Sequence, residues 1–265
     1  MTLADRVSTH HEVRRAEHTT IRYTASGPVG GPTLLLIHGW ACSRSDFDGV
    51  TRHLPAGQRV LAVDLAEHGA SRSVREVWTM EEFAHDVAAV LAAESVSTAV
   101  VAGHSLGGAV AVEVARLLPE VVTQVVALDA LTFLPLFPAM DEERAEATMR
   151  GYRTDFATAV RRAVEDGSPA GTDPERVTAY YEKMVAVRQP AGTRALEGLV
   201  RWDMDAALRA TRQPITVFSV RALLAQEAVD RYRDRLTIVP VDLGSHHFPV
   251  EAPEATAELL VSVVG

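Results

Sequence analysis

Short, uninterrupted apolar runs recur along the chain, separated by segments whose apolar residues return every three to four positions. An apolar run of this kind is typical of a strand buried on both faces of a sheet. The runs lie at 33–37, 59–64, 97–102, 121–129, 215–220 and 236–241. Helical spacing appears at 79–94, 106–118 and 251–263, and residues 12–25 have the pattern of a hairpin of two short strands. Strands that alternate with helices predict an α/β protein with a mostly parallel central sheet flanked by helices.

One long interval interrupts this alternation. Residues 131–205 contain no strand-like run. Helical spacing appears within this interval at 141–150, 155–165, 174–187 and 193–200. A structureless loop of this length has no place in a compact domain. We therefore predict a helical lid at 131–205, inserted into a sheet domain that is formed by 1–130 and 206–265.

The composition is that of an ordinary globular protein, with 265 residues of which 47% are hydrophobic and 23% charged. The net charge is −9, so the chain lacks the excess of positive charge that binding to nucleic-acid phosphates requires. The single cysteine, Cys42, excludes a disulfide framework and a multi-cysteine metal site. The first residues lack the apolar core of a signal peptide, and no apolar run is long enough to span a membrane. We expect a cytoplasmic protein without a metal or cofactor; the sequence sets no oligomeric state.

The strongest chemical signal is the motif G-x-S-x-G at 103–107, which places Ser105 between a predicted strand and a predicted helix. Glycines on both sides allow a turn too sharp for larger residues. The serine then lies at the tip of the turn, at the positive end of the helix dipole. The pattern matches neither the phosphate-binding loop nor the dinucleotide-binding fingerprint.

Four segments together resemble the α/β-hydrolase fold superfamily over nearly the whole chain outside the predicted lid. They are HGW at 38–40, DLAEHGAS at 64–71, GHSLGG at 103–108 and GSHHFPVEAPE at 244–254. The resemblance implies a serine nucleophile, Ser105, and an oxyanion hole formed by the backbone amides of Trp40 and Leu106. It also implies that His38 braces the loop that carries Trp40.

The general base is expected on the loop after the last strand, where two histidines stand side by side. In the family, a glutamate follows the base by five positions and a proline follows it by seven. Counting back from Glu251 and Pro253 gives His246 both times. The local string His-Phe-Pro instead favours His247. We expect His246 to be the base and keep His247 as the alternative.

The acid departs from the commoner pattern of the family. Most members carry it after the strand that follows the lid, here 215–220, but no carboxylate appears there before Glu227. The other position used in the family is the end of the strand after the nucleophile helix, where Asp129 stands. A carboxylate at the end of a buried strand is costly unless it has a partner such as an imidazole. We therefore expect Asp129 to be the acid, with Glu227 as the alternative.

These residues predict a serine-dependent hydrolase that cleaves a hydrophobic carboxylic ester or lactone through an acyl-enzyme. Apolar side chains at 133–140 are expected to face Ser105 and to form the substrate pocket. The same triad also suits a C–C bond hydrolase, a thioesterase or a cofactor-free perhydrolase. A ligand receptor without enzymatic activity is the alternative from another class, because fold alone does not decide function.

Overall fold

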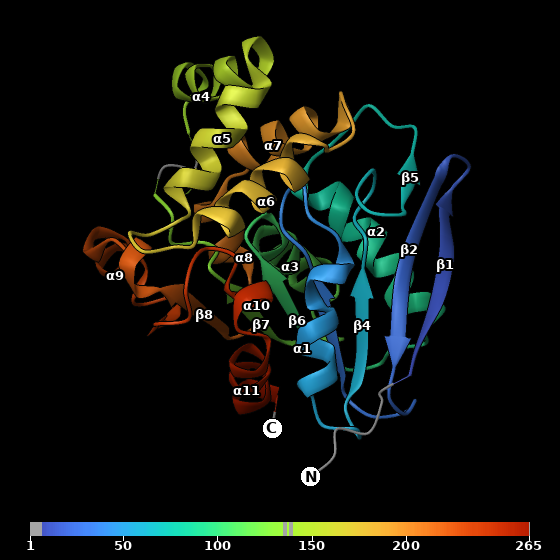
Figure 1. Ribbon diagram of the computed structural model, residues 1–265. Coiled ribbons are helices and arrows are strands. Elements are labelled where there is room, and N and C mark those ends of the chain that lie inside the picture. The colour runs from blue at the N-terminus through green and yellow to red at the C-terminus, as the bar shows by residue number, and fades with distance from the viewer. Residues whose placement is uncertain (1–6, 135–136, 138–139, 265) are drawn as a thin grey trace.

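A mixed sheet forms the centre of the protein in the computed structural model, which describes residues 7–134, 137 and 140–264 (Figure 1). Its strands are β1 Ser8–Ala16, β2 Thr19–Ser26, β3 Thr33–Ile37, β4 Arg59–Val63, β5 Arg72–Ser73, β6 Ala99–His104, β7 Val122–Leu128, β8 Ile215–Val220 and β9 Thr237–Val241. Their order across the sheet is β1-β2-β4-β3-β6-β7-β8-β9, with β5 beside β2. From β4 to β9 all neighbours are parallel, whereas β1, β2 and β5 pair in the antiparallel sense.

Helices cover both faces of the sheet, as the alternating pattern predicts. One face carries α2 Met80–Ala93, α3 Leu106–Leu117 and α8 Met204–Ala210; the other carries α1 Asp48–His53, α10 Phe248–Glu251 and α11 Pro253–Val264. Strand β3 shows how one apolar run serves both layers. Leu35 and Ile37 pack with α2 and α3, whereas Leu34 and Leu36 pack with α1 and α11. Because successive side chains of a strand point to opposite faces, the whole run is buried.

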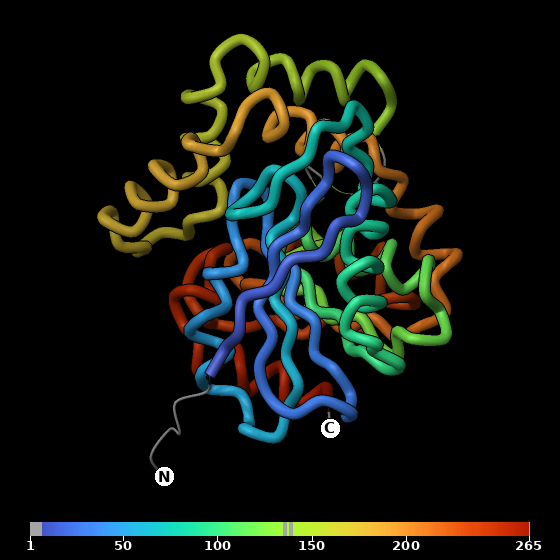
Figure 2. Tube along the Cα trace, turned by 90° about the vertical axis from the view of Figure 1, so that its right-hand side faces the viewer, coloured from blue at the N-terminus to red at the C-terminus, as the bar shows by residue number. Residues whose placement is uncertain are grey.

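Four helices stand over the carboxyl ends of the parallel strands, and we call them the helical insertion (Figures 1 and 2). They are α4 Glu142–Thr154, α5 Phe156–Asp166, α6 Pro174–Val185 and α7 Ala191–Val200. An aspartate side chain caps the start of three of them: Asp141 before α4, Asp155 before α5 and Asp173 before α6. Each accepts a hydrogen bond from a first-turn N–H that has no acceptor within its own helix.

Hydrogen bonds from buried side chains fix the insertion to the sheet domain. The indole of Trp40, after β3, donates to the carbonyl of Gly192 at 2.7 Å. The indole of Trp202, after α7, donates to Glu113 in α3 at 2.7 Å. Burial raises the pKa of the Glu113 carboxyl. Such contacts hold the insertion in one place because a buried polar group left unpaired is costly.

The predicted fold class is confirmed, and most helices and strands lie within a few residues of their expected positions. Sequence periodicity missed the short helices α1, α8 and α10, the two-residue β5, and the 3-10 turns Arg44–Phe47 and Arg221–Leu223. A further helix, α9 Gln226–Tyr232, lies between β8 and β9. The division into a sheet domain and a lid at 131–205 stays a prediction. None of the described helices has the length and apolarity needed to cross a membrane.

Candidate active site

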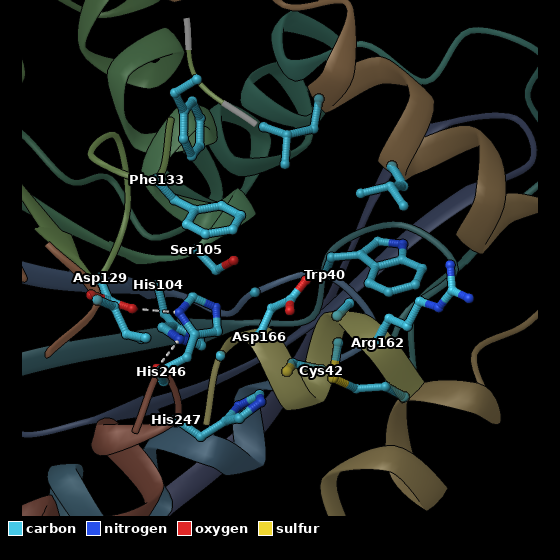
Figure 3. A pocket seen from close by; sticks show the side chains of 18 of the residues that line it. Trp40, Cys42, His104, Ser105, Asp129, Phe133, Arg162, Asp166, His246 and His247 are labelled. Atoms are coloured by element: carbon cyan, nitrogen blue, oxygen red, sulfur yellow. Dashed lines mark hydrogen bonds and ion pairs between the residues drawn. The ribbon is translucent and has the colours of Figure 1, made fainter. Parts of the chain in front are cut away.

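A cavity of about 420 Å³ lies between the carboxyl ends of the strands and the helical insertion (Figure 3). Its wall includes the predicted site residues Trp40, Ser105, Asp129 and His246, together with His247. The apolar part of the wall comes mainly from Phe133, Phe137, Tyr152, Met184, Leu196 and Leu199. Of the expected pocket segment at 133–140, residues 135–136 and 138–139 lie outside the described part of the chain.

Ser105 occupies a sharp turn between β6 and α3. Its φ of 53° and ψ of −120° are unusual for a residue with a side chain. The neighbouring Gly107 explains how so tight a turn packs: a Cβ on Gly107 would lie 2.4 Å from the carbonyl oxygen of Ile37. The first turn of α3 therefore rests directly on the end of β3, and Ser105 is presented to the cavity. No hydrogen bond joins the Ser105 hydroxyl to another described residue.

Asp129 and His246 are joined by a short hydrogen bond. The Nδ1 atom of His246 lies 2.6 Å from Oδ2 of Asp129. The other carboxylate oxygen, Oδ1, accepts from the backbone N–H of Val220 at 2.8 Å and lies 3.4 Å from the hydroxyl of Ser219. The Asp129 carboxylate is 8% exposed, so these donors replace the water that it has lost.

The two adjacent histidines have different surroundings. His246 faces the cavity with its imidazole partly exposed, whereas His247 is buried and stacks on the Tyr180 ring of α6 at 4.0 Å between centroids. Burial lowers the pKa of His247 well below its ordinary value, and the neighbouring His246 adds to this. The geometry therefore brings His246, and not His247, to the carboxylate of Asp129.

Glu251, which sets the spacing used to choose His246, has a physical role in this loop. Its carboxylate accepts from the N–H and from the hydroxyl of Ser245, each at 2.7 Å. It also accepts from the Tyr180 hydroxyl at 3.0 Å. The carboxylate thus folds the histidine loop back on itself and ties the loop to the insertion.

The alternative acid, Glu227, is not brought to this site. It is exposed in the first turn of α9 and is not among the lining residues. Leu223, on the turn before α9, lines the cavity instead.

The expected oxyanion-hole residues, Trp40 and Leu106, follow β3 and begin α3 respectively. The N–H of Leu106 belongs to the first helical turn, where backbone donors have no acceptor within the helix and favour a negative charge. The loop of Trp40 is braced by His38, whose Nε2 accepts from the N–H of Leu65 at 3.0 Å. The use of these two amides as an oxyanion hole stays a prediction.

Three ionisable residues of the cavity wall were not singled out from the sequence: His104, Arg162 and Asp166. Arg162 and Asp166 lie one turn apart in α5, and no ion pair or hydrogen bond joins either side chain to another described residue. Figure 3 shows the Asp166 carboxylate turned into the cavity. Burial raises the pKa of Tyr152 to about 12, and the charge of Asp166 contributes. Nothing in the spacing of α5 distinguishes these two charges from those of a solvated helix face.

The described part of the chain contains one cysteine, Cys42, which is buried. Burial raises the pKa of the Cys42 thiol, which disfavours the nucleophilic thiolate. Among the described residues, no group of three or more histidine, cysteine, aspartate or glutamate side chains is placed to hold a metal ion.

Comparisons with known proteins identify the family and the fold of the chain. The model of the alpha/beta hydrolase family matches residues 34–259. Two curated relatives are named pimeloyl-[acyl-carrier protein] methyl ester esterase. The protein of Methylococcus capsulatus is 33% identical over 221 residues, covering 81% of this chain and 80% of the relative. That of Nitrosomonas europaea is 30% identical over 202 residues, covering 72% and 77%.

A solved structure has a closely similar fold. The structure of a hydrolase from Pseudomonas aeruginosa PA01 superposes with a TM-score of 0.81 at 20% identity. The match covers 97% of this chain and 98% of that chain. The likeness shows that the arrangement of the sheet and its helices is shared.

Because several histidines are buried, we expect the free energy of unfolding to fall in acid. Burial lowers the pKa of His68 to about 3 in the folded protein, below its ordinary value of 6.5. Unfolding therefore takes up a proton between these two pH values, and the free energy of unfolding rises with pH across the window. For one such histidine the gain from about pH 5 to about pH 7 is about 2 kcal/mol.

Urea unfolding at both pH values measures this difference for the wild type and for His68→Gln. The variant should lose about 2 kcal/mol of the pH dependence, because glutamine does not titrate. His85→Gln, at an exposed position, is the control and should keep the wild-type dependence. An equal pH dependence in all three proteins would show that His68 is not held neutral by the fold.

Proposed function

The chain belongs to the alpha/beta hydrolase family and is an enzyme that hydrolyses ester bonds, and from that premise we propose that Ser105, His246 and Asp129 are its catalytic triad. The observation that carries the proposal is the 2.6 Å contact of Asp129 Oδ2 with His246 Nδ1, in a cavity that Ser105 also lines. A carboxylate that accepts from Nδ1 leaves Nε2 as the basic nitrogen of the imidazole.

In the proposed reaction, His246 Nε2 takes the proton of the Ser105 hydroxyl as Oγ attacks the carbonyl carbon of the ester. The backbone N–H groups of Trp40 and Leu106 donate to the oxyanion that forms. The imidazolium then gives its proton to the departing alkoxide, which leaves an acyl-enzyme. Water, deprotonated by the same imidazole, releases the acid and restores Ser105. Asp129 holds the imidazole tautomer and balances its charge throughout.

The proposed substrate is a largely hydrophobic carboxylic ester or lactone. The aromatic and aliphatic side chains of the cavity wall support this class, since such walls bury the apolar part of a ligand. The two relatives are named for a methyl ester, whose small leaving group needs little room beside the serine. In this proposal the helical insertion serves as the lid of the cavity.

Arg162 and Asp166 make one wall of the cavity polar, and they refine this proposal. A few polar groups in an apolar pocket set the orientation of a ligand. The Asp166 carboxylate would repel an anionic group on the substrate and would accept a hydrogen bond from a hydroxyl, an amide N–H or an ammonium group. We therefore expect the charge of Asp166 to disfavour anionic esters relative to neutral or donor-bearing esters of the same length.

Replacing the nucleophile tests the core of the proposal. Ser105→Ala should lower kcat by about 10⁶-fold, because the acyl-enzyme can no longer form. Steady-state hydrolysis of a short-chain chromogenic ester measures this effect. An organophosphonate should add once to the wild type, at Ser105, and mass spectrometry of the intact protein should find no addition to Ser105→Ala. A variant with wild-type kcat would show that Ser105 is not the nucleophile.

Two single variants test the choice of the acid. Asp129→Asn should lower kcat by up to about 10⁴-fold, because the amide favours the wrong imidazole tautomer. Glu227→Gln should change kcat by less than about tenfold, because Glu227 lies on the surface of α9, outside the cavity wall. An inactive Glu227→Gln beside an active Asp129→Asn would assign the acid to Glu227.

The charge of Asp166 is tested with chromogenic esters of equal length that end in a carboxylate or in a neutral group. Asp166→Asn should raise kcat/KM for the anionic ester about fivefold relative to the neutral one, since one like-charge repulsion is worth about 1 kcal/mol here. Glu165→Gln is the matched control, because it removes the same charge from the same helix outside the cavity wall. An equal preference in all three proteins would contradict a role for Asp166 in selectivity.

A further inference from the structure

The backbone of His246 is held from both sides. Its N–H donates to the carbonyl oxygen of Gly167 at 2.8 Å. Its own carbonyl oxygen accepts from Nε2 of His104 at 2.8 Å. With Nδ1 bound to Asp129, every polar group of His246 except Nε2 has a partner among the described residues. Nε2 is the one atom that the proposed reaction needs free.

One partner, His104, is the last residue of β6 and directly precedes Ser105. A carbonyl oxygen can only accept, so the hydrogen of the His104 imidazole must be on Nε2. The residue is 4% exposed, and burial lowers the pKa of His104 to about 3, with the nearby His246 adding to the effect. The imidazole is therefore a neutral donor at any ordinary assay pH. It joins the serine turn to the histidine loop, 142 residues later in the sequence.

The second partner, Gly167, ends α5 and belongs to the helical insertion. A Cβ on Gly167 would lie 3.0 Å from Cβ of His246, closer than side chains normally approach. The backbone of the insertion therefore touches His246 directly. The absence of a side chain at this position allows the 2.8 Å hydrogen bond to form.

We propose that His104 and Gly167 are positioning residues that align His246 with Ser105. The imidazole of His246 is then correctly placed for proton transfer only while the helical insertion is docked. This inference rests on the proposed function, since it assigns the alignment of the proposed base. The serine turn fixes His246 through its carbonyl group, and the insertion fixes it through its N–H.

The expected size of the effect follows from the geometry of proton transfer. Nε2 must come within about 2.6–3.2 Å of the serine oxygen. A displacement of about 1 Å costs about 10²-fold in rate. Loss of one of the two backbone contacts should therefore lower kcat by about 10- to 100-fold and leave KM nearly unchanged, because neither contact is made to the substrate.

The test compares two replacements of His104. In His104→Gln the side-chain amide N–H takes the place of Nε2–H, and kcat should stay within about threefold of the wild type. His104→Leu fills similar space without a donor, and kcat should fall by about 10- to 100-fold. The rate of covalent phosphonate addition to Ser105, which also requires the base, should fall in parallel. Thermal unfolding shows that each variant is folded.

Combining each change with His246→Ala separates alignment from general damage. With no base to align, His104→Leu should lower the residual rate of acyl-enzyme formation by less than about twofold. A residue that merely supports the serine turn would lower the rate in both backgrounds by the same factor. If His104→Leu does not fold, His104→Asn replaces it, because its shorter amide cannot reach the carbonyl of His246.

Gly167 is tested in the same assays. Gly167→Ala should lower kcat by about tenfold with little change in KM, because the added methyl group displaces His246. Ser168→Ala, one residue further on, is the control and should keep the wild-type kcat. Wild-type kcat in both His104→Leu and Gly167→Ala, or an equal loss for His104→Leu with and without His246, would overturn the inference. Activity retained in Ser105→Ala would instead overturn the proposed function.

Discussion

The parallel direction of β3, β6, β7, β8 and β9 decides where Trp40, Ser105, Asp129 and His246 can lie. Because these strands run the same way, their carboxyl ends meet at one edge of the sheet. Trp40 follows β3, Ser105 follows β6, Asp129 follows β7 and His246 follows β9. The residues come from four separate stretches of the chain, yet the sheet leaves them a single place in which to meet. The cavity exists because the helical insertion covers that edge.

The same parallel arrangement explains why the proposed acid, Asp129, can follow β7 rather than β8. At the end of β8, the N–H of Val220 and the hydroxyl of Ser219 face the carboxylate of Asp129. These groups of β8 satisfy one carboxylate oxygen, and His246 takes the other. A second carboxylate at the end of β8 would place two like charges beside one imidazole. Strand β8 therefore contributes hydrogen-bond donors in place of an acid.

The sheet and the serine turn could be predicted because their signals are local. Each buried strand is a continuous apolar run, and the turn around Ser105 requires small residues at fixed spacing. Short helices such as α1 and α8 contain too few apolar repeats for their helical periodicity to be recognised in the sequence. His104, Gly167 and Asp166 could not be predicted, because their significance depends on how the insertion docks. The contact between His246 and Gly167 has no counterpart in any local pattern.

The contacts through which the insertion reaches Trp40 and His246 constrain few of its residues beyond Gly167 and Gly192, where a Cβ would crowd a neighbouring side chain. It accepts a hydrogen bond from the indole of Trp40 through the carbonyl of Gly192, and another from the N–H of His246 through the carbonyl of Gly167. Backbone carbonyls accept hydrogen bonds whatever the neighbouring side chains are. The side chains of α4 and α5 that face the cavity are therefore free to change with the substrate while the alignment of the site is kept. Side chains such as that of Asp166 can set the selectivity. The backbone carbonyl of Gly167, one residue later, can keep the site aligned.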